Sequence, residues 1–253
     1  MTSAERRDEI KAEFESLHGD WDESWEAVHE LDPEFLHAFA RFHAVPARKG
    51  DLEPKVQEFV RIVVDANATH LYTRDVRGHI RRALDAGATP AEVMEVLECA
   101  ATVGIHAMNV GVPVLVDVME ELGLREGPAP LDEYQERLKA EFTENRGYWN
   151  PTWDEMLELD PEAFEAYTDF SSVPWKNGAL DPKIKEFLYI AFDTAATHLY
   201  TTGLRLHIVN AIGYGATPRE ILAVMEIAST IGMQTVREAA PLLVEEARRS
   251  AER

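Results

Sequence analysis

Glutamate and histidine stand at matching positions in the two halves of this sequence, and together they are suited to moving protons. A histidine beside a carboxylate can be poised near neutrality, as general acid–base catalysis requires. We predict that these groups are catalytic in both halves. They are Glu58, His70 and His79 and, 128 positions later, Glu186, His198 and His207.

Tyrosine and arginine accompany these groups and could bind a substrate. An Ala-Thr-His-Leu-Tyr-Thr segment supplies a tyrosine in each half, and an arginine stands two residues before the later histidine. An arginine can hold a carboxylate through two hydrogen bonds, or it can form a surface ion pair of little value. A further histidine, at position 106, either packs on a helix face or lines a site. The predicted substrate-binding residues are Tyr72, Arg77, His106, Tyr200 and Arg205.

A metal site is an alternative use of the same side chains. Glu58, His70 and His79 could form a set of two histidines and one carboxylate with open positions for water or substrate. Their spacing is not a known metal motif, however, and two separate segments would have to converge. We therefore expect neither a metal nor a cofactor.

The 128-residue offset extends over the chain without a gap, and residues 68–73, for example, recur as 196–201. Two copies of a long unit indicate a duplicated domain rather than a solenoid, which needs three or more short repeats. We predict a first domain over residues 1–126 and a second over 127–253. A Gly- and Pro-containing hinge at 123–131 separates their helices.

Helix signals dominate both copies, and alternating strand patterns are nearly absent. Thr89-Pro90 and Thr217-Pro218 are each followed by a glutamate that completes a capping box, and Gly87 and Gly215 would close the preceding helices. We predict an all-α fold. Its helices are expected at about 5–17, 33–43, 54–69, 75–86, 90–103 and 107–122, and at 132–143, 161–170, 182–197, 203–214, 218–231 and 235–249.

These bounds place His79 in the first turn or so of its helix. The positive end of the helix macrodipole would disfavour the imidazolium there, and a neighbouring carboxylate would favour it. The balance predicts a histidine poised near neutrality.

Charge and composition exclude several classes of function. The net charge of −21 argues against binding to nucleic acid or to anionic membranes. We see no apolar run approaching the roughly 20 residues of a membrane span, and the charged N-terminus does not resemble a signal peptide. One cysteine, Cys99, allows neither an internal disulfide nor a cysteine-based metal cluster, and we interpret it as a core residue. We expect a cytoplasmic protein with a small-molecule ligand.

The order of these motifs resembles the carboxymuconolactone decarboxylase and alkylhydroperoxidase-D-like family. The resemblance rests on Pro-Lys-Val-Gln-Glu-Phe, Ala-Thr-His-Leu-Tyr, the stretch His79-x3-Ala-x3-Gly-x-Thr-x2-Glu, and Gly111-Val-Pro113. It covers about 54–120 and 182–248. It implies an all-α domain that assembles into trimers or hexamers, so we expect a homo-oligomer, with a trimer favoured.

The peroxidase branch of this family uses the pattern Glu-x11-Cys-x2-Cys-x3-His. His70 and His198 stand at the first cysteine position and Thr73 and Thr201 at the second. Without a thiolate nucleophile, dithiol peroxidase activity is not expected.

The decarboxylase branch needs no thiol. Loss of CO2 from a γ-carboxylated lactone leaves a delocalised carbanion, which needs a proton donor and a polar group over the developing oxyanion. The resemblance thus implies thiol-independent acid–base chemistry on a small carboxylated or lactone-type metabolite. The alternative is a non-catalytic oligomeric helical module that binds a ligand or partner. A cavity that encloses Glu58, His70 and His79 would favour the enzyme.

Overall fold

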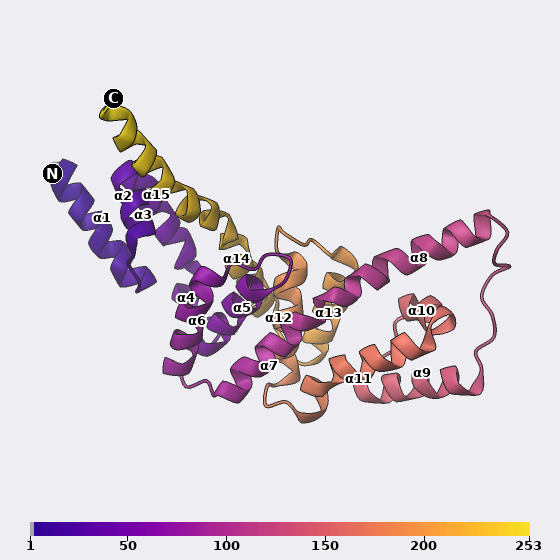
Figure 1. Ribbon diagram of the computed structural model, residues 1–253. Helices are drawn as coiled ribbons and strands as arrows, with labels where there is room; N and C mark the ends of the chain where they lie inside the picture. The colour runs from indigo at the N-terminus through magenta and orange to yellow at the C-terminus, as the bar shows by residue number, and fades with distance from the viewer. Residues whose placement is uncertain (1–2) are drawn as a thin grey trace.

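The computed structural model describes residues 3–253, apart from the side chains of Ser3 and Asn177, and throughout that range its regular elements are helices (Figure 1). The first repeat contains α1 (Ser3–His18), α2 (Glu23–Leu31), α3 (Pro33–His43), α4 (Val45–Lys49), α5 (Pro54–Ala66), α6 (Thr73–Asp85), α7 (Pro90–Ala101), η1 (Thr102–Ile105) and α8 (His106–Glu121). The second contains α9 (Glu133–Arg146), η2 (Pro151–Trp153), α10 (Asp154–Leu159), α11 (Pro161–Asn177), α12 (Pro182–Thr194), α13 (Thr201–Gly213), α14 (Pro218–Ala228), η3 (Ser229–Ile231) and α15 (Gly232–Ala251). The predicted all-α tandem fold is confirmed.

The loop after α5 and its copy after α12 differ from the prediction. Helix α5 ends at Ala66 rather than near 69, and the side chain of Asn67 then accepts hydrogen bonds from the Thr69 backbone and hydroxyl. Helix α12 ends at the equivalent Thr194, although Ala195 replaces Asn67 there. Leu71 then takes a left-handed φ of 54°, and its copy Leu199 takes 51°. A side chain with a Cβ pays about 1–2 kcal/mol for this conformation, and both copies retain it. The helices α6 and α13 consequently begin earlier than predicted.

Four helical segments, α2, α4, η2 and α10, were not predicted at all. Helix α2 begins after Asp22, whose side chain accepts hydrogen bonds from the backbone of Ser24 and Trp25. The short α10 occupies the corresponding place in the second repeat. Both are brief, and α10 in particular offers too few turns for a clear hydrophobic period.

The predicted capping boxes are present at both sites. The side chains of Thr89 and Thr217 each accept a hydrogen bond from the backbone of the third helical residue. That residue is a glutamate, whose side chain accepts from the backbone N–H of the threonine. Gly87 and Gly215 have φ of 90° and 86°, as expected for glycines that end a helix.

The central core combines both repeats. Phe59 and Ile62 of α5 and Val96 of α7 share one apolar cluster with Phe187 and Ile190 of α12. The labels of α5, α7, α12 and α14 accordingly lie together in the middle of the molecule (Figure 1). A buried ion pair crosses this core, since Lys185 Nζ lies 3.0 Å from Glu95 Oε1.

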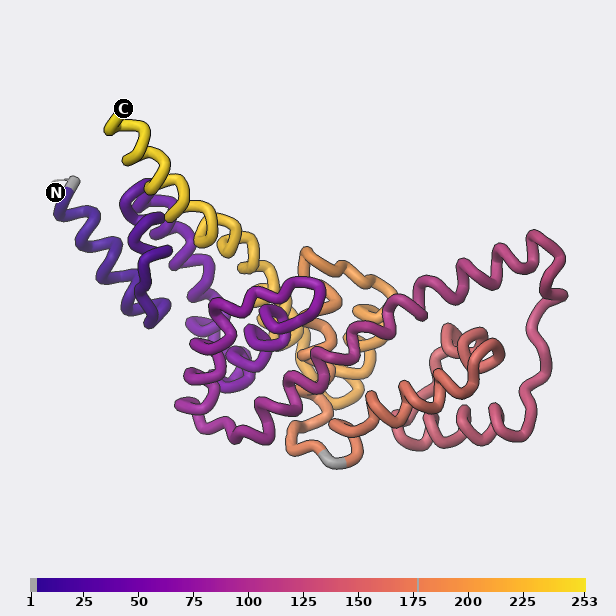
Figure 2. The backbone as a smooth tube through the Cα atoms, viewed as in Figure 1, coloured from indigo at the N-terminus to yellow at the C-terminus, as the bar shows by residue number. Residues whose placement is uncertain are grey.

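The last helix of each repeat leaves its own copy and packs on the N-terminal helices of the other. The C-terminal helix α15 contributes Met233 and Val244 to a cluster with Trp25 and Leu36 of the first repeat. Conversely, α8 contributes Val112 to a cluster formed by α9, α10 and α11. Figure 2 shows the yellow C-terminal helix beside the indigo N-terminal helices, with the two termini near each other. Apolar clusters therefore cross the boundary predicted at 126/127, whose position stays a prediction.

The stretch Pro90–Glu121, which joins α7, η1 and α8, is long and apolar enough to cross a membrane, with a mean hydropathy of 1.6 in its most apolar window. The sequence prediction that no apolar run approaches this length was wrong. Part of this apolarity serves packing, because Cys99 and Val112 are buried in two different clusters. Other side chains, including Val114 and Leu115, remain exposed.

Candidate active site

Helices α5 and α6 bring two carboxylates to one histidine. Glu58 and Asp65 lie seven residues, or two turns, apart on the same face of α5. The Nδ1 atom of His79 lies 2.8 Å from Glu58 Oε2, and its Nε2 atom lies 3.4 Å from Asp65 Oδ2. All three groups are largely removed from solvent. The ring of His79 is therefore flanked by an acidic group on each side.

This environment favours the charged form of His79. Burial alone would lower its pKa, but hydrogen bonds to Asp65 and Glu58 outweigh that effect and raise the pKa above its usual value. The helix-dipole expectation was wrong, because α6 begins at Thr73 and His79 therefore lies in the second turn. The flanking carboxylates control the proton instead.

Arginines on the other side of Glu58 keep that carboxylate ionised. Arg82 Nε donates to Glu58 Oε2 at 3.2 Å, and Arg61 Nε lies 3.5 Å from Glu58 Oε1. Burial would raise the pKa of Glu58, but His79 and the two arginines lower it overall. Arg82 Nη2 also lies 2.6 Å from His79 Nδ1. His79 Nδ1 can thus donate to Glu58 when it is protonated and accept from Arg82 when it is not.

A cavity of about 290 Å³ opens beside His79 and Asp65. In the part of the chain that the structure describes, Arg77 makes no ion pair or hydrogen bond, whereas Arg237, for example, pairs with Asp22 and Asp75. An unpaired guanidinium facing a cavity is suited to bind an incoming carboxylate. Six arginines line the cavity: Arg61, Arg74, Arg77, Arg81, Arg82 and Arg237.

His70 does not line this cavity but is linked to it. Its Nε2 atom forms a short contact with the Gln234 side chain, and Gln234 Nε2 donates to Asp65 Oδ1 at 2.8 Å. Gln234 belongs to α15, so the second repeat completes the site of the first. A hydrogen-bonded chain thus runs from His70 through Gln234 and Asp65 to His79.

The second repeat repeats the glutamate–histidine pair in a different setting. His207 Nδ1 lies 2.6 Å from Glu186 Oε2, and Asn210 stands where the first repeat has Arg82. Tyr189 replaces Arg61 and stacks on His207 with ring centres 4.6 Å apart. The adjoining cavity measures only about 60 Å³. This space is much smaller than the cavity of about 290 Å³ beside His79.

The remaining predicted binding residues have different positions. His106 and Tyr200 stack on each other, with centroids 4.0 Å apart, and both line the smaller cavity. Tyr72 stacks beside His70 outside the larger cavity, and Arg205 is exposed and lines neither. The structure therefore brings Arg77 to the first site but does not bring Arg205 to the second.

Sequence reasoning missed Asp65 and its copy Asp193, although a signal was present. Each is an acidic residue at the end of an apolar run, seven positions after the retained glutamate, in both repeats. That spacing places it on the same helix face as the glutamate. Gln234 and Arg237 carried no such signal, since the copies of these positions hold His106 and Asn109.

Cys99 is fully buried, as predicted for a core residue. Burial raises the pKa of its thiol to about 12. Almost none of the reactive thiolate is present at neutral pH.

Comparison with known proteins agrees with the duplicated architecture. The model of the carboxymuconolactone decarboxylase family matches residues 33–117 and again 161–245, so each match begins earlier than the sequence resemblance suggested. The chain is also similar to a crystal structure from Burkholderia xenovorans LB400, provisionally described as a gamma-carboxymuconolactone decarboxylase subunit. The identity is 52%, the TM-score is 0.94, and the alignment covers 96% of this chain and 98% of that one. A search of curated proteins gave no significant match. The chain belongs to the carboxymuconolactone decarboxylase family, as a tandem member with two helical repeats.

Proposed function

We propose that the cavity of the first repeat decarboxylates a small carboxylated lactone without using a thiol. The observation that supports this most directly is the juxtaposition of an arginine-lined cavity with His79, whose pKa is raised by the carboxylates of Asp65 and Glu58. The similarity to the B. xenovorans protein and to the family supports the same class of substrate. A binding module without chemistry would not need a histidine whose proton is held by two buried carboxylates.

The reaction assigns a distinct task to each group. Arg77 binds a substrate carboxylate, and the other guanidinium groups offset the repulsion that the acidic chain exerts on an anion. The bond between the lactone ring and the departing carboxylate breaks, CO2 leaves, and the electron pair moves into the conjugated lactone carbonyl. The imidazolium of His79 then gives its proton to the carbanion and becomes neutral. Water restores that proton before the next turnover.

Glu58 and Asp65 prepare His79 for this step. Their negative charges keep the ring protonated before CO2 leaves, and Arg82 can donate to Nδ1 when that nitrogen carries no proton. The first repeat carries this arrangement with room for substrate. The catalytic role of Glu186, His198 and His207 stays a prediction, because the cavity beside them is small.

An assay with γ-carboxymuconolactone tests the proposal. Trp21 and Trp25 line the cavity, so binding can be followed by fluorescence in parallel with release of CO2. We expect CO2 release and, in deuterated water, one deuterium on the product carbon. Binding of the lactone without CO2 release at saturation would refute the proposed reaction, and failure to bind would refute the substrate class.

A further inference from the structure

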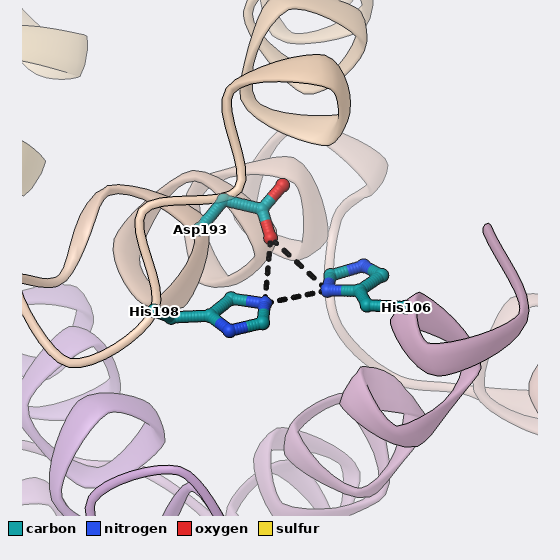
Figure 3. Close-up of side chains that lie close together, drawn as sticks. All are labelled: His106, Asp193 and His198. Atoms are coloured by element: carbon teal, nitrogen blue, oxygen red, sulfur yellow. Dashed lines mark hydrogen bonds and ion pairs between the residues drawn. The ribbon is translucent and has the colours of Figure 1, made fainter. Parts of the chain in front are cut away.

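Three side chains with metal-binding atoms converge where α8 of the first repeat meets α12 of the second, away from the Glu58–His79 pair. His106 comes from the start of α8, whereas Asp193 and His198 come from the end of α12 and the loop that follows (Figure 3). His106 Nδ1 lies 2.6 Å from His198 Nε2. Asp193 Oδ1 lies 3.8 Å from the first nitrogen and 4.0 Å from the second. All three atoms thus surround one point.

The carboxylate of Asp193 is buried without a donor. Its side chain is 0% exposed, and within the described residues neither oxygen accepts a hydrogen bond. Burying an ionised carboxylate is costly unless a cation or hydrogen-bond donors compensate it. Gly203 allows the backbone of α13 to lie close to this carboxylate, because a Cβ atom there would lie 2.5 Å from Asp193 Oδ2.

In the first repeat, the equivalent carboxylate is compensated by a hydrogen-bond donor rather than by a cation. Asp65, the copy of Asp193, accepts from Gln234 Nε2 at 2.8 Å. Gln234 is the copy of His106, so an amide donor in one repeat is replaced by an imidazole in the other. An imidazole nitrogen with a free lone pair is a metal ligand rather than a donor to a carboxylate.

We propose that His106 Nδ1, His198 Nε2 and Asp193 bind one divalent transition-metal ion such as Zn²⁺. Tetrahedral ligands at roughly 2.0–2.1 Å from zinc are separated by about 3.3–3.4 Å. The three distances between the ligand atoms here, 2.6, 3.8 and 4.0 Å, lie on both sides of that value. Small side-chain adjustments therefore suffice. Two imidazoles and one carboxylate select zinc, iron, cobalt or nickel over Mg²⁺ and Ca²⁺. Of the three side chains, His106 also lines the small cavity.

A second cluster, formed by Asp65, Asp75 and His79, does not carry the same inference. Arg237 Nη1 pairs with Asp75, and Gln234 donates to Asp65. The negative charge of that cluster is already compensated by the chain itself. The inference is thus specific to the cluster in Figure 3, and it does not depend on the proposed decarboxylation.

The test is a metal titration of tag-free protein that has been stripped with a chelator. We expect one Zn²⁺ per chain by calorimetry and elemental analysis, and Co²⁺ should give the visible absorption of a low-coordinate nitrogen–oxygen site. His106→Gln introduces the residue type of its copy Gln234, which donates to Asp65, and Asp193→Asn is isosteric. Each should weaken binding by more than the roughly 10–100-fold that loss of an outer-shell contact causes.

Matched controls make the result decisive. His70→Gln alters the copy of His198 in the first repeat and should keep one ion per chain. Melting temperatures establish that each variant is folded. Absence of stoichiometric binding in the unmodified protein would overturn the proposal, as would unchanged affinity in folded His106→Gln and Asp193→Asn. Anomalous diffraction at the zinc edge should place the ion between the three side chains.

Discussion

Replacement of His79 by glutamine separates proton transfer from packing. Glutamine can still donate to Glu58 Oε2, which now lies 2.8 Å from the ring, but it carries no transferable proton at neutral pH. General acid–base catalysis contributes typically 10²–10⁴-fold to a rate. We expect turnover on a carboxylated lactone to fall by about that factor, while the loss of a buried, paired ring costs about 1–3 kcal/mol of stability.

The same variant has a pH signature. The pKa of His79 is raised in the folded protein, so its stabilising contribution is complete below the unfolded pKa of about 6.5 and is lost as pH rises through the folded value. The difference in unfolding free energy between the unmodified protein and His79→Gln should therefore be larger at pH 6 than at pH 9. Urea titrations at both pH values measure it.

His207→Gln is the matched control, because His207 has the same partner type but adjoins a cavity of only about 60 Å³. We expect it to retain most of the activity. Glu58→Gln should resemble His79→Gln, and the double variant should lose much less than the sum, since the two groups act as a unit. Full activity of a stably folded His79→Gln would refute the acid–base mechanism.

Three other expectations follow from individual side chains. Arg77→Lys should raise the KM for a carboxylate substrate by about 10–100-fold with little change in kcat. This change corresponds to the loss of a charge-assisted hydrogen bond of about 1.5–3 kcal/mol. Arg205→Lys, at the exposed copy of this position, should leave both constants unchanged in the same steady-state assay. His18 is half-buried with its Nδ1 atom removed from solvent, and burial lowers its pKa to about 3. Stability should therefore fall as pH drops from about 6.5 toward 3, by up to about 4–5 kcal/mol for this residue. Chemical denaturation should show a smaller loss for His18→Phe, and an equal loss would contradict the assignment. We propose that the exposed apolar faces around Val114 and its copy Leu242, which are 59% and 63% exposed, join chains into a homo-oligomer, most simply a trimer. Light scattering should show smaller species for the double variant Val114→Glu, Leu242→Glu. An unmodified protein that is monomeric at micromolar concentration would refute this proposal.

The sequence predicted the helices with strong end signals better than the connections between them. The capping boxes at Thr89 and Thr217 fixed two helix starts, because the pattern is local. The end of α5 was placed late, since the turn contains a left-handed Leu71, and its copy at Leu199 forms with Ala195 in place of Asn67. A leucine does not indicate a left-handed turn when its residue type is read alone.

The glutamate–histidine pair of the site was also predictable, because both members recur at one offset. The contribution of Gln234 was not, since it arrives from a helix 164 residues away from His70. Exchange of α8 and α15 between the repeats is a property of packing, and periodicity within one helix does not reveal its partner. The unequal size of the two cavities has the same origin, as it depends on side chains from several helices at once.

Exchange of the final helices has a consequence for symmetry. Two separate, identical chains that traded α15-like helices would form two identical sites, and any mutation would alter both. Here the connection between α8 and α9, residues 122–132, tethers the two copies and holds them at high effective concentration. Each copy can then mutate alone, so that one chain keeps Gln234 beside Asp65 and places His106 beside Asp193. Two separate identical chains would have to keep two equivalent sites. The fused chain can instead carry two different sites, each with its own chemistry.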